Sequence, residues 1–117
     1  MNYDFVSKWL ETMRNAWLNA DMQTIQLLFA KTNEYYETPF HKPATNINEI
    51  LELWKSIESQ TIKHLEFVIL AVDKNTAIVQ WIFECESVNF DGIYQIKFND
   101  NQECVFFKAW EMAKPLN

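Results

Sequence analysis

Glycine is nearly absent from the sequence, and its scarcity excludes a large group of functions. Gly92 is the only glycine among 117 residues. Nucleotide-binding loops use several closely spaced glycines so that backbone N–H groups can approach a phosphate. The chain has no such loop, so the common glycine-rich nucleotide sites are excluded. No other cofactor motif stands out, and we expect the protein to use no cofactor.

Long apolar runs and basic residues are also scarce. The longest uninterrupted apolar run covers residues 67–72, whereas a helix that spans a bilayer needs about 20 apolar residues. The N-terminal region has an early acid, Asp4, and no long apolar stretch, so we expect no secretory signal. With 10 basic and 16 acidic residues the formal charge is -6, which phosphate groups would repel. We therefore expect no nucleic-acid partner and no membrane partner held by charge.

The few cysteines and histidines are too dispersed for a metal site. Cys85 and Cys104 form no CxxC pair, and His41 and His64 have no cluster of carboxylates beside them. A domain of this length folds without a covalent staple, so two buried free thiols are favoured over a disulfide. Free thiols indicate a reducing compartment, and we expect a cytoplasmic protein.

Large apolar side chains, by contrast, are abundant. Hydrophobic residues make up 49% and aromatic residues 15% of the chain. This predicts one folded domain over residues 1–117 with a core rich in rings. In the first half, apolar residues recur at helical spacing, and each run follows a residue that can cap a helix. We expect helices over about residues 3–18, 22–30 and 47–57, capped by Asn2 or Asp4, by Asp21, and by Asn46 with Glu49.

After about residue 62 the apolar period changes to two, which predicts strands. Short connections rich in Asp and Asn separate these strands, so neighbours must be antiparallel, because parallel neighbours need long crossovers. Helices followed by a meander indicate an α+β domain with the helices on one face of the sheet. We expect a short strand over residues 33–36 and long strands over residues 62–72, 76–87, 88–98 and 103–112.

The most informative segment lies between the second and third helices. Residues 35–43 read YYETPFHKP, so two aromatic rings, a carboxylate and a Pro-Phe turn share one short connection. Large rings left in water are unfavourable in a plain loop. We therefore expect this segment to form the rim of a cavity.

An ordered set of short sequences runs through nearly the whole chain. Its parts are WLNAD at 17–21, LFA at 28–30, YYETPF at 35–40, EI at 49–50 with Trp54, LAV at 70–72, AIVQW at 77–81, FDGIY at 90–94 and FKAW at 107–110. In this order the chain resembles the nuclear transport factor 2-like superfamily, and within it the SnoaL-like branch. The resemblance implies a cone-shaped, cystatin-like fold, in which a strongly curved, mostly antiparallel sheet packs on three N-terminal helices. It also implies a pocket at the open end of the cone and a homodimer through the outer face of the sheet.

An open cone would have an aromatic wall, and the expected ligand is then a hydrophobic small molecule. The same rings also suit a filled core, since each buried ring contributes about 2–3 kcal/mol to folding, and the two interpretations have equal weight. An open cone predicts a pocket protein, with a polyketide-cyclase-like or related enzyme as one form. A filled cone predicts a non-catalytic binding or dimerisation module. The predicted ligand contacts are Met13, Trp17, Tyr36, Phe40, Trp54, Trp81, Phe83, Tyr94 and Phe107, with Tyr35 beside them near the mouth.

Four residues are candidates for catalysis: Glu37, His41, Tyr94 and Glu111. Glu111 ends an inward-facing row of the last strand, so it is either an acid–base group at the mouth or a solvated carboxylate. Tyr94 can donate a hydrogen bond from an apolar wall. His41 follows the Pro-Phe turn and either faces a ligand or lies in solvent.

The similarity to the steroid isomerases of the same superfamily breaks at the catalytic base. Those enzymes keep a proton-abstracting Asp in a Glu-Asp-Pro run, and the equivalent residue here is Thr38. Strand alternation predicts that Glu37 points to the opposite face from Thr38, so it does not replace the base. Met13 stands where the isomerases have a Tyr, and Tyr94 where they have a protonated Asp. Isomerase activity is therefore disfavoured.

The strand face that points away from the helices mixes large apolar and polar residues. Ile82, Ile93, Phe106 and Trp110 alternate there with glutamine and lysine. Such a mixture suits a two-fold interface better than bulk water. We predict a homodimer through this face of the sheet.

Overall fold

A computed structural model describes residues 1–115, and its elements agree closely with the expected ones. The helices are α1 (Tyr3–Leu18), α2 (Met22–Leu28), α3 (Ile47–Trp54) and a 3-10 helix, η1 (Lys55–Ser59). The strands are β1 (Glu34–Tyr36), β2 (Ile62–Asp73), β3 (Thr76–Cys85), β4 (Asn89–Phe98) and β5 (Cys104–Lys114). The third helical segment changes to the tighter 3-10 form after α3, which the sequence pattern did not indicate.

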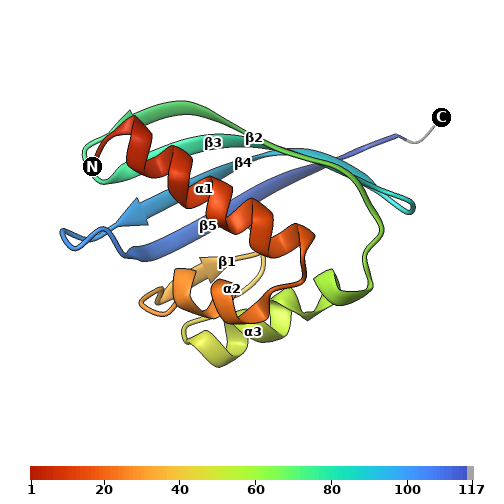
Figure 1. Ribbon diagram of the computed structural model, residues 1–117, viewed down its shortest axis with the longest axis horizontal. Coiled ribbons are helices and arrows are strands. Elements are labelled where there is room, and N and C mark those ends of the chain that lie inside the picture. The colour runs from red at the N-terminus through yellow and green to blue at the C-terminus, as the bar shows by residue number, and fades with distance from the viewer. Residues whose placement is uncertain (116–117) are drawn as a thin grey trace.

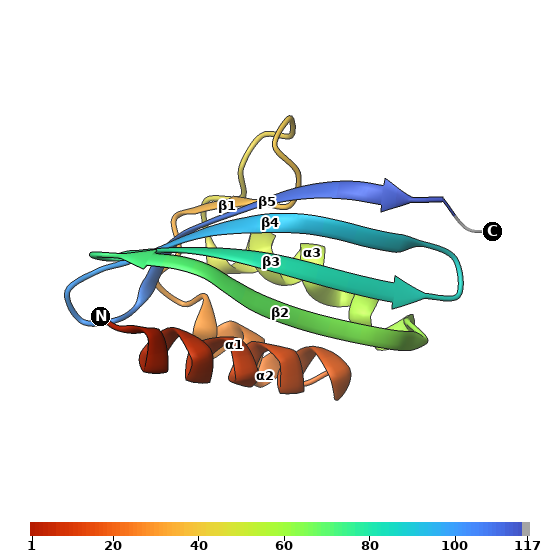
Figure 2. The ribbon, with the colours of Figure 1, turned by 90° about the horizontal axis from the view of Figure 1, so that it is seen from above.

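The strands of the described chain form one sheet in the order β1-β5-β4-β3-β2. The predicted meander is confirmed, because β2, β3, β4 and β5 pair antiparallel with their neighbours in the chain. The short β1 joins the other edge and runs parallel to β5. The helices lie on one face of the curved sheet, as Figures 1 and 2 show from two directions. The α+β architecture is therefore as expected.

Each helix begins at a capping residue that the sequence predicts. Asn2 Oδ1 accepts a hydrogen bond from the Phe5 N–H at 2.9 Å. Asp21 and Asn46 cap α2 and α3 in the same way, at 3.1 Å and 3.0 Å. These bonds satisfy N–H groups that have no partner inside the helix, so they help to fix where each helix starts.

Alternation along the central strands separates a core face from an outer face. Successive residues of β3 are half-buried and buried in turn, and β4 follows the same pattern from Gly92 onwards. The inner rows are the ones that strand alternation predicted. They consist of Ala77, Val79, Trp81, Phe83 and Cys85 on β3, and of Gly92, Tyr94, Ile96 and Phe98 on β4.

One end of the interior is filled with rings. This is the end where α1 begins and β4 ends (Figure 1). Trp9 packs edge-to-face on Phe29 and on Phe98, with ring centroids 5.7 Å and 5.4 Å apart, and Phe5 meets Phe98 in the same geometry. The interpretation of a filled cone therefore holds for this half of the molecule.

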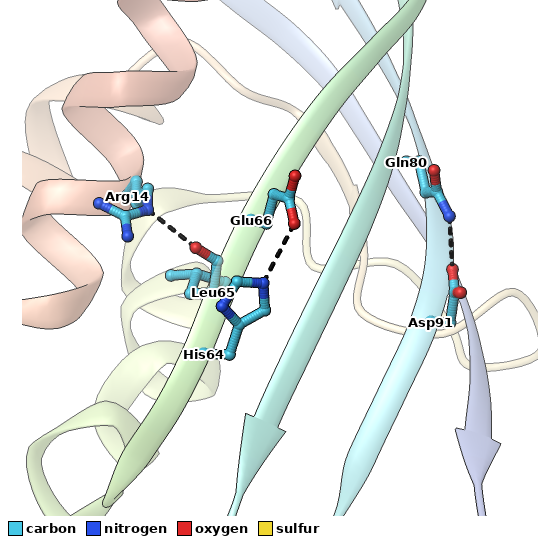
Figure 3. A network of polar contacts seen from close by, with 6 residues as sticks. All are labelled: Arg14, His64, Leu65, Glu66, Gln80 and Asp91. Atoms are coloured by element: carbon cyan, nitrogen blue, oxygen red, sulfur yellow. Dashed lines mark hydrogen bonds and ion pairs between the residues drawn. The ribbon is translucent and has the colours of Figure 1, made fainter.

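The edge strand β2 is irregular and is tied to the first helix. Its pairing register with β3 slips at residues 62–64 and 69–71. Bulges of this kind bend a strand and increase its local twist. From α1, Arg14 Nε donates a hydrogen bond to the Leu65 carbonyl on β2 at 2.8 Å (Figure 3). The helix is thereby fixed along the edge of the sheet.

Two further expectations concern the cysteines and the membrane. Cys85 and Cys104 are both buried and free, which confirms the prediction of free thiols over a disulfide. No helix in the described part of the chain is long and apolar enough to cross a membrane.

Candidate functional site

A cavity of about 230 Å³ lies between the inner face of the sheet and the segment formed by α3 and η1. It is partly open to solvent, so the end of the interior that faces α3 and η1 is hollow, whereas the end around Trp9 is filled. The aromatic and aliphatic lining consists of Trp17, Tyr35, Leu53, Trp54, Ile57, Trp81, Phe83, Phe90, Tyr94, Phe107 and Ala109. The polar lining consists of Glu37, Thr38, Ser56, Gln60 and Glu111.

Most of the predicted contact residues belong to this wall. The ones that line the cavity are Trp17, Trp54, Trp81, Phe83, Tyr94 and Phe107. They come from α1, α3, β3, β4 and β5, so helical and strand periodicity converge on one space. Their position is settled, and their contact with a ligand stays a prediction.

Three predicted contacts lie elsewhere. Met13 is fully buried in the core one helical turn before Trp17, and it does not reach the cavity. Tyr36 points to the outer side of β1, where its ring packs near Phe106. Phe40 is 95% exposed at the tip of the loop after β1. For these residues the expectation of a place on the wall was wrong.

Two phenols stand side by side on the sheet wall. Tyr94 stacks on Trp81, with ring centroids 5.1 Å apart, and also packs against Phe107 at 4.6 Å. Tyr35 stacks on Phe107 at 5.0 Å. Burial raises the pKa of both phenols, so both stay protonated at neutral pH. Neither hydroxyl has a hydrogen-bond partner within residues 1–115, and both are free to bond to a molecule in the cavity.

Gly92 allows the Trp81 indole to form the floor of the cavity. The two residues are direct cross-strand partners on β4 and β3. The Trp81 Nε1–H donates to the Trp110 carbonyl of β5 at 3.2 Å, so the ring lies across the glycine. A Cβ at position 92 would be 2.0 Å from that carbonyl oxygen and 2.6 Å from Trp81 Nε1. The sequence therefore has its single glycine where space, and not backbone freedom, requires one.

Trp54 closes the helical side of the cavity. Its ring packs edge-to-face on Trp17 at 5.2 Å, and Trp17 Nε1 donates to Gln60 Oε1 at 2.9 Å. Trp54 Nε1 is buried and meets no acceptor at hydrogen-bond geometry among the described residues. Burial raises the pKa of Tyr35, and the nearby Trp54 indole opposes part of the rise. The indole N–H and the phenol are therefore close but not aligned.

Two carboxylates, Glu37 and Glu111, meet at the mouth. Desolvation raises the pKa of the half-buried Glu111 and also that of Glu37, although the Glu37 side chain is exposed by surface area, and the negative charge of Glu37 raises the pKa of Glu111 further. Glu37 and Thr38 both line the cavity, although strand alternation predicted opposite directions for them. That prediction was wrong because β1 ends at Tyr36, so the alternation of a strand does not continue through the next two residues.

The histidines differ in their relation to the mouth. His41 is exposed and does not line the cavity, but it lies close enough to oppose the rise in pKa of Glu37 and of Glu111. His64 lies on the outer face, and its Nε2 is 3.1 Å from Glu66 Oε1 (Figure 3). Within residues 1–115, no three His, Cys, Asp or Glu side chains are grouped so as to hold a metal ion.

Several wall residues were missed by the sequence analysis. Phe90 has the same strand parity as Gly92 and Tyr94, and Ala109 has the same parity as Phe107, so strand parity was sufficient to find both. The others have no comparable signal, because they come from the loop after β1, from the end of α3, from η1 and from the residue that follows η1. They are Thr38, Leu53, Ser56, Ile57 and Gln60.

Comparisons with known proteins identify the fold. No protein-family profile matches the chain, and no curated protein matches it by sequence. Among solved structures, it is similar to a steroid delta-isomerase from Pseudomonas aeruginosa, with a TM-score of 0.72 and 14% identity over 99% of this chain and 83% of that one. It is also similar to an NTF-2-like protein of unknown function from Burkholderia xenovorans LB400, with a TM-score of 0.75 and 10% identity over 97% of this chain and 87% of that one.

A third similar structure is an LEH-like epoxide hydrolase from M. tuberculosis, with a TM-score of 0.66 and 14% identity over 90% of this chain and 80% of that one. The chain thus has the nuclear transport factor 2-like fold, which confirms the expected architecture. At these identities the likeness establishes the fold alone, since one fold supports many activities. The SnoaL-like branch stays a prediction.

Proposed function

We propose that the protein binds a small, apolar, ring-bearing molecule in the cavity between the sheet and α3. The observation that carries the proposal is the composition of the wall: eight of its 16 residues are aromatic. An apolar cavity of about 150 Å³ holds a benzene molecule, so a space of about 230 Å³ suits a somewhat larger, two-ring compound. Stacked and edge-to-face rings on the wall favour an aromatic ligand over a flexible aliphatic one.

The names of the structural neighbours support the same class of ligand. One is described as a steroid delta-isomerase and another as an epoxide hydrolase. By those names, both act on small organic compounds. We therefore propose that the cavity of this chain holds a small organic compound as well.

We further propose that the protein is an enzyme of the polyketide-cyclase-like or a related type. Proton-transfer reactions need an acid–base group, and a hydrogen-bond donor near the oxygen on which charge develops. Glu37 and Glu111 supply carboxyl groups at the mouth, and Tyr94 supplies a phenol on the wall. Thr38 cannot act as a base, so proton abstraction by the isomerase route stays disfavoured.

Dye binding to two tryptophan variants tests the proposal. Trp54→Ala removes a ring from the wall, whereas the control Trp9→Ala removes the same ring from the packed end. We expect both variants to have a lower Tm, because both rings are buried. Only Trp54→Ala should weaken the binding of Nile red, a neutral apolar dye, several-fold at a temperature where both variants are folded. Equal dye affinity of Trp54→Ala and the native chain would assign Trp54 to the core.

The outer face of the sheet supports a second proposal, a homodimer. Trp110 is 37% exposed there, and the Lys108 ammonium lies 5.0 Å from the centre of its ring. Around it, Ile82, Ile93 and Phe106 are half-buried in the single chain. The face thus presents large apolar side chains among polar ones, as many two-fold interfaces do.

A further inference from the structure

We infer that the ligand carries a protonated amine, which lies between Glu37 and Glu111 at the mouth while its ring system occupies the aromatic interior. The inference rests on the proposed function, because it requires a molecule in the cavity. It adds a chemical class to that function: an aromatic amine that is cationic at neutral pH.

The charged side chains on the wall are all negative. Among the described residues that line the cavity there are two glutamates and no lysine, arginine or histidine. A carboxylate ligand would be repelled by both glutamates and would find no cation on the wall. A neutral ligand would pack against the rings but would leave both acids without a counter-charge. An ammonium group is attracted by both carboxylates at once.

Glu37 and Glu111 share the mouth although they belong to different segments. Glu37 follows β1, and Glu111 lies on β5, the strand that pairs with β1. Desolvation raises the pKa of both carboxyls, and Glu37 adds to the rise at Glu111. The charge of Glu37 opposes the ionisation of Glu111, and a cation placed beside both carboxylates would stabilise their charged forms.

The phenols are independent evidence that the cavity is built for a polar ligand. Tyr35 and Tyr94 are 6% and 4% exposed, line the cavity, and have no hydrogen-bond partner in the described part of the chain. Among the described residues, the only fully enclosed side-chain nitrogen or oxygen without a partner is Trp54 Nε1, so the two hydroxyl oxygens reach the open space of the cavity. Burial raises the pKa of Tyr94 most, and the neighbouring Tyr35 and the charge of Glu111 raise it further. This phenol therefore lies within electrostatic reach of the mouth. The hydroxyls can therefore accept N–H bonds or hold a second polar group of the ligand.

The aromatic wall also favours a cation. An ammonium or amine next to the face of Trp or Tyr is attracted by the ring quadrupole, most strongly at a desolvated site. Trp81 and Tyr94 stack in parallel at 5.1 Å on the wall below the mouth. The cavity therefore has both aromatic rings and carboxylates on its wall, the two kinds of contact that recognise an organic cation.

The inference predicts a pH dependence with a defined sign. The titratable groups within electrostatic reach of the pair are His41 on the loop after β1, Tyr35 on β1 and Tyr94 on β4. The two phenols stay protonated through neutral pH. An amine binds best when both carboxyls are ionised, so its affinity should rise with pH as Glu37 and Glu111 lose their protons. A neutral analogue should lack this rise.

A matched set of indoles tests the inference. Tryptamine, tryptophol and indole-3-propionate share one ring system and end in an ammonium, a hydroxyl and a carboxylate. NMR titrations of the ¹⁵N-labelled chain at pH 7.5 measure each dissociation constant and locate each site. We expect tryptamine to bind at least tenfold more tightly than tryptophol, and indole-3-propionate to bind most weakly. The shifted signals should include the Trp54 indole N–H and the Gly92 amide.

Three variants separate the mouth from general electrostatics. Glu37→Gln and Glu111→Gln should each reduce the preference for tryptamine several-fold and leave the affinity for tryptophol nearly unchanged. Glu84→Gln makes the same change of charge on β3, where the residue pairs with Asn89 and does not line the cavity. It should leave the preference intact.

The outcomes distinguish this inference from the proposed function. Tryptophol binding in the cavity as tightly as tryptamine would overturn the amine, while the proposed pocket would stand. A preference for tryptamine that survives in the Glu37→Gln/Glu111→Gln double variant would also overturn it. Failure of all three indoles and of Nile red to perturb the cavity signals would overturn both.

Discussion

Gly92→Ala places a methyl group beneath the Trp81 indole, which forms the floor of the cavity, where the neighbouring strand leaves no room. The new Cβ would lie 2.0 Å from the Trp110 carbonyl oxygen and 2.6 Å from Trp81 Nε1. The carbonyl belongs to the backbone of β5 and cannot move without that strand. β4 and β5 must therefore separate locally, and the Trp81 indole must also leave its position over residue 92. Both changes disturb the wall on which Tyr94 is stacked.

The cost has two parts. Overpacking of a core position costs about 1–3 kcal/mol. Displacement of the indole also breaks the bond from Trp81 Nε1 to the Trp110 carbonyl, and a buried donor left unpaired costs about 1–3 kcal/mol. We therefore expect Gly92→Ala to lower the free energy of unfolding by about 4 kcal/mol, which corresponds to a fall in Tm of roughly 15 °C in a domain of this size.

Urea unfolding followed by circular dichroism measures this change, and a double-mutant cycle assigns its cause. Trp81→Phe removes the indole N–H and part of the ring, so alanine at position 92 should cost less in that background. A cost below about 1 kcal/mol in the native background would refute the close approach. An undiminished cost in the Trp81→Phe background would show that the β5 carbonyl alone, and not the indole, excludes the methyl group.

Three other variants test other parts of the structure. The folded state raises the pKa of Glu111, so it binds this proton more readily than the unfolded chain, and stability falls as pH rises through the folded pKa. Glu111→Gln should therefore raise Tm at pH 7.5 but not near pH 4; an equal change at both pH values would argue against burial as the cause. Trp110→Glu should convert a dimer to a monomer in light scattering, and a dimer that persists would place the interface elsewhere. Asn46→Ala removes the cap of α3 and should cost about 1 kcal/mol in urea unfolding, whereas an unchanged midpoint would mean that water replaces the cap without loss.

The sequence predicted most of the fold because its signals are local and redundant. Helix caps such as Asp21 stand directly before apolar residues at helical spacing, and the period of two persists through each long strand. Inner and outer faces follow from parity once a strand is long enough. Residues 34–36 are too few to establish parity, so Tyr36 was expected on the wall where Tyr35 lies.

The site was predicted less well because a cavity depends on position along an element as well as on its face. Met13 and Trp17 share the buried stripe of α1, but only Trp17 lies near the hollow end. The exposure of Phe40 depends on the path of its loop, which no period describes. Glu37 and Glu111 are far apart in the chain but line one cavity, and the pairing of β1 with β5 that brings their segments together was not foreseen.

The bond between Arg14 and Leu65 affects how molecules of this protein can associate. A strand of 12 residues at the border of a sheet is a template on which another chain can extend the hydrogen-bonded ladder. Here a guanidinium already occupies one of its acceptors, and two bulges distort the remainder. Edge-to-edge association of sheets, which would build fibres, is thereby obstructed at β2. Loss of Arg14 would free that acceptor, and variants at this position are the ones in which fibrous aggregation should be sought first.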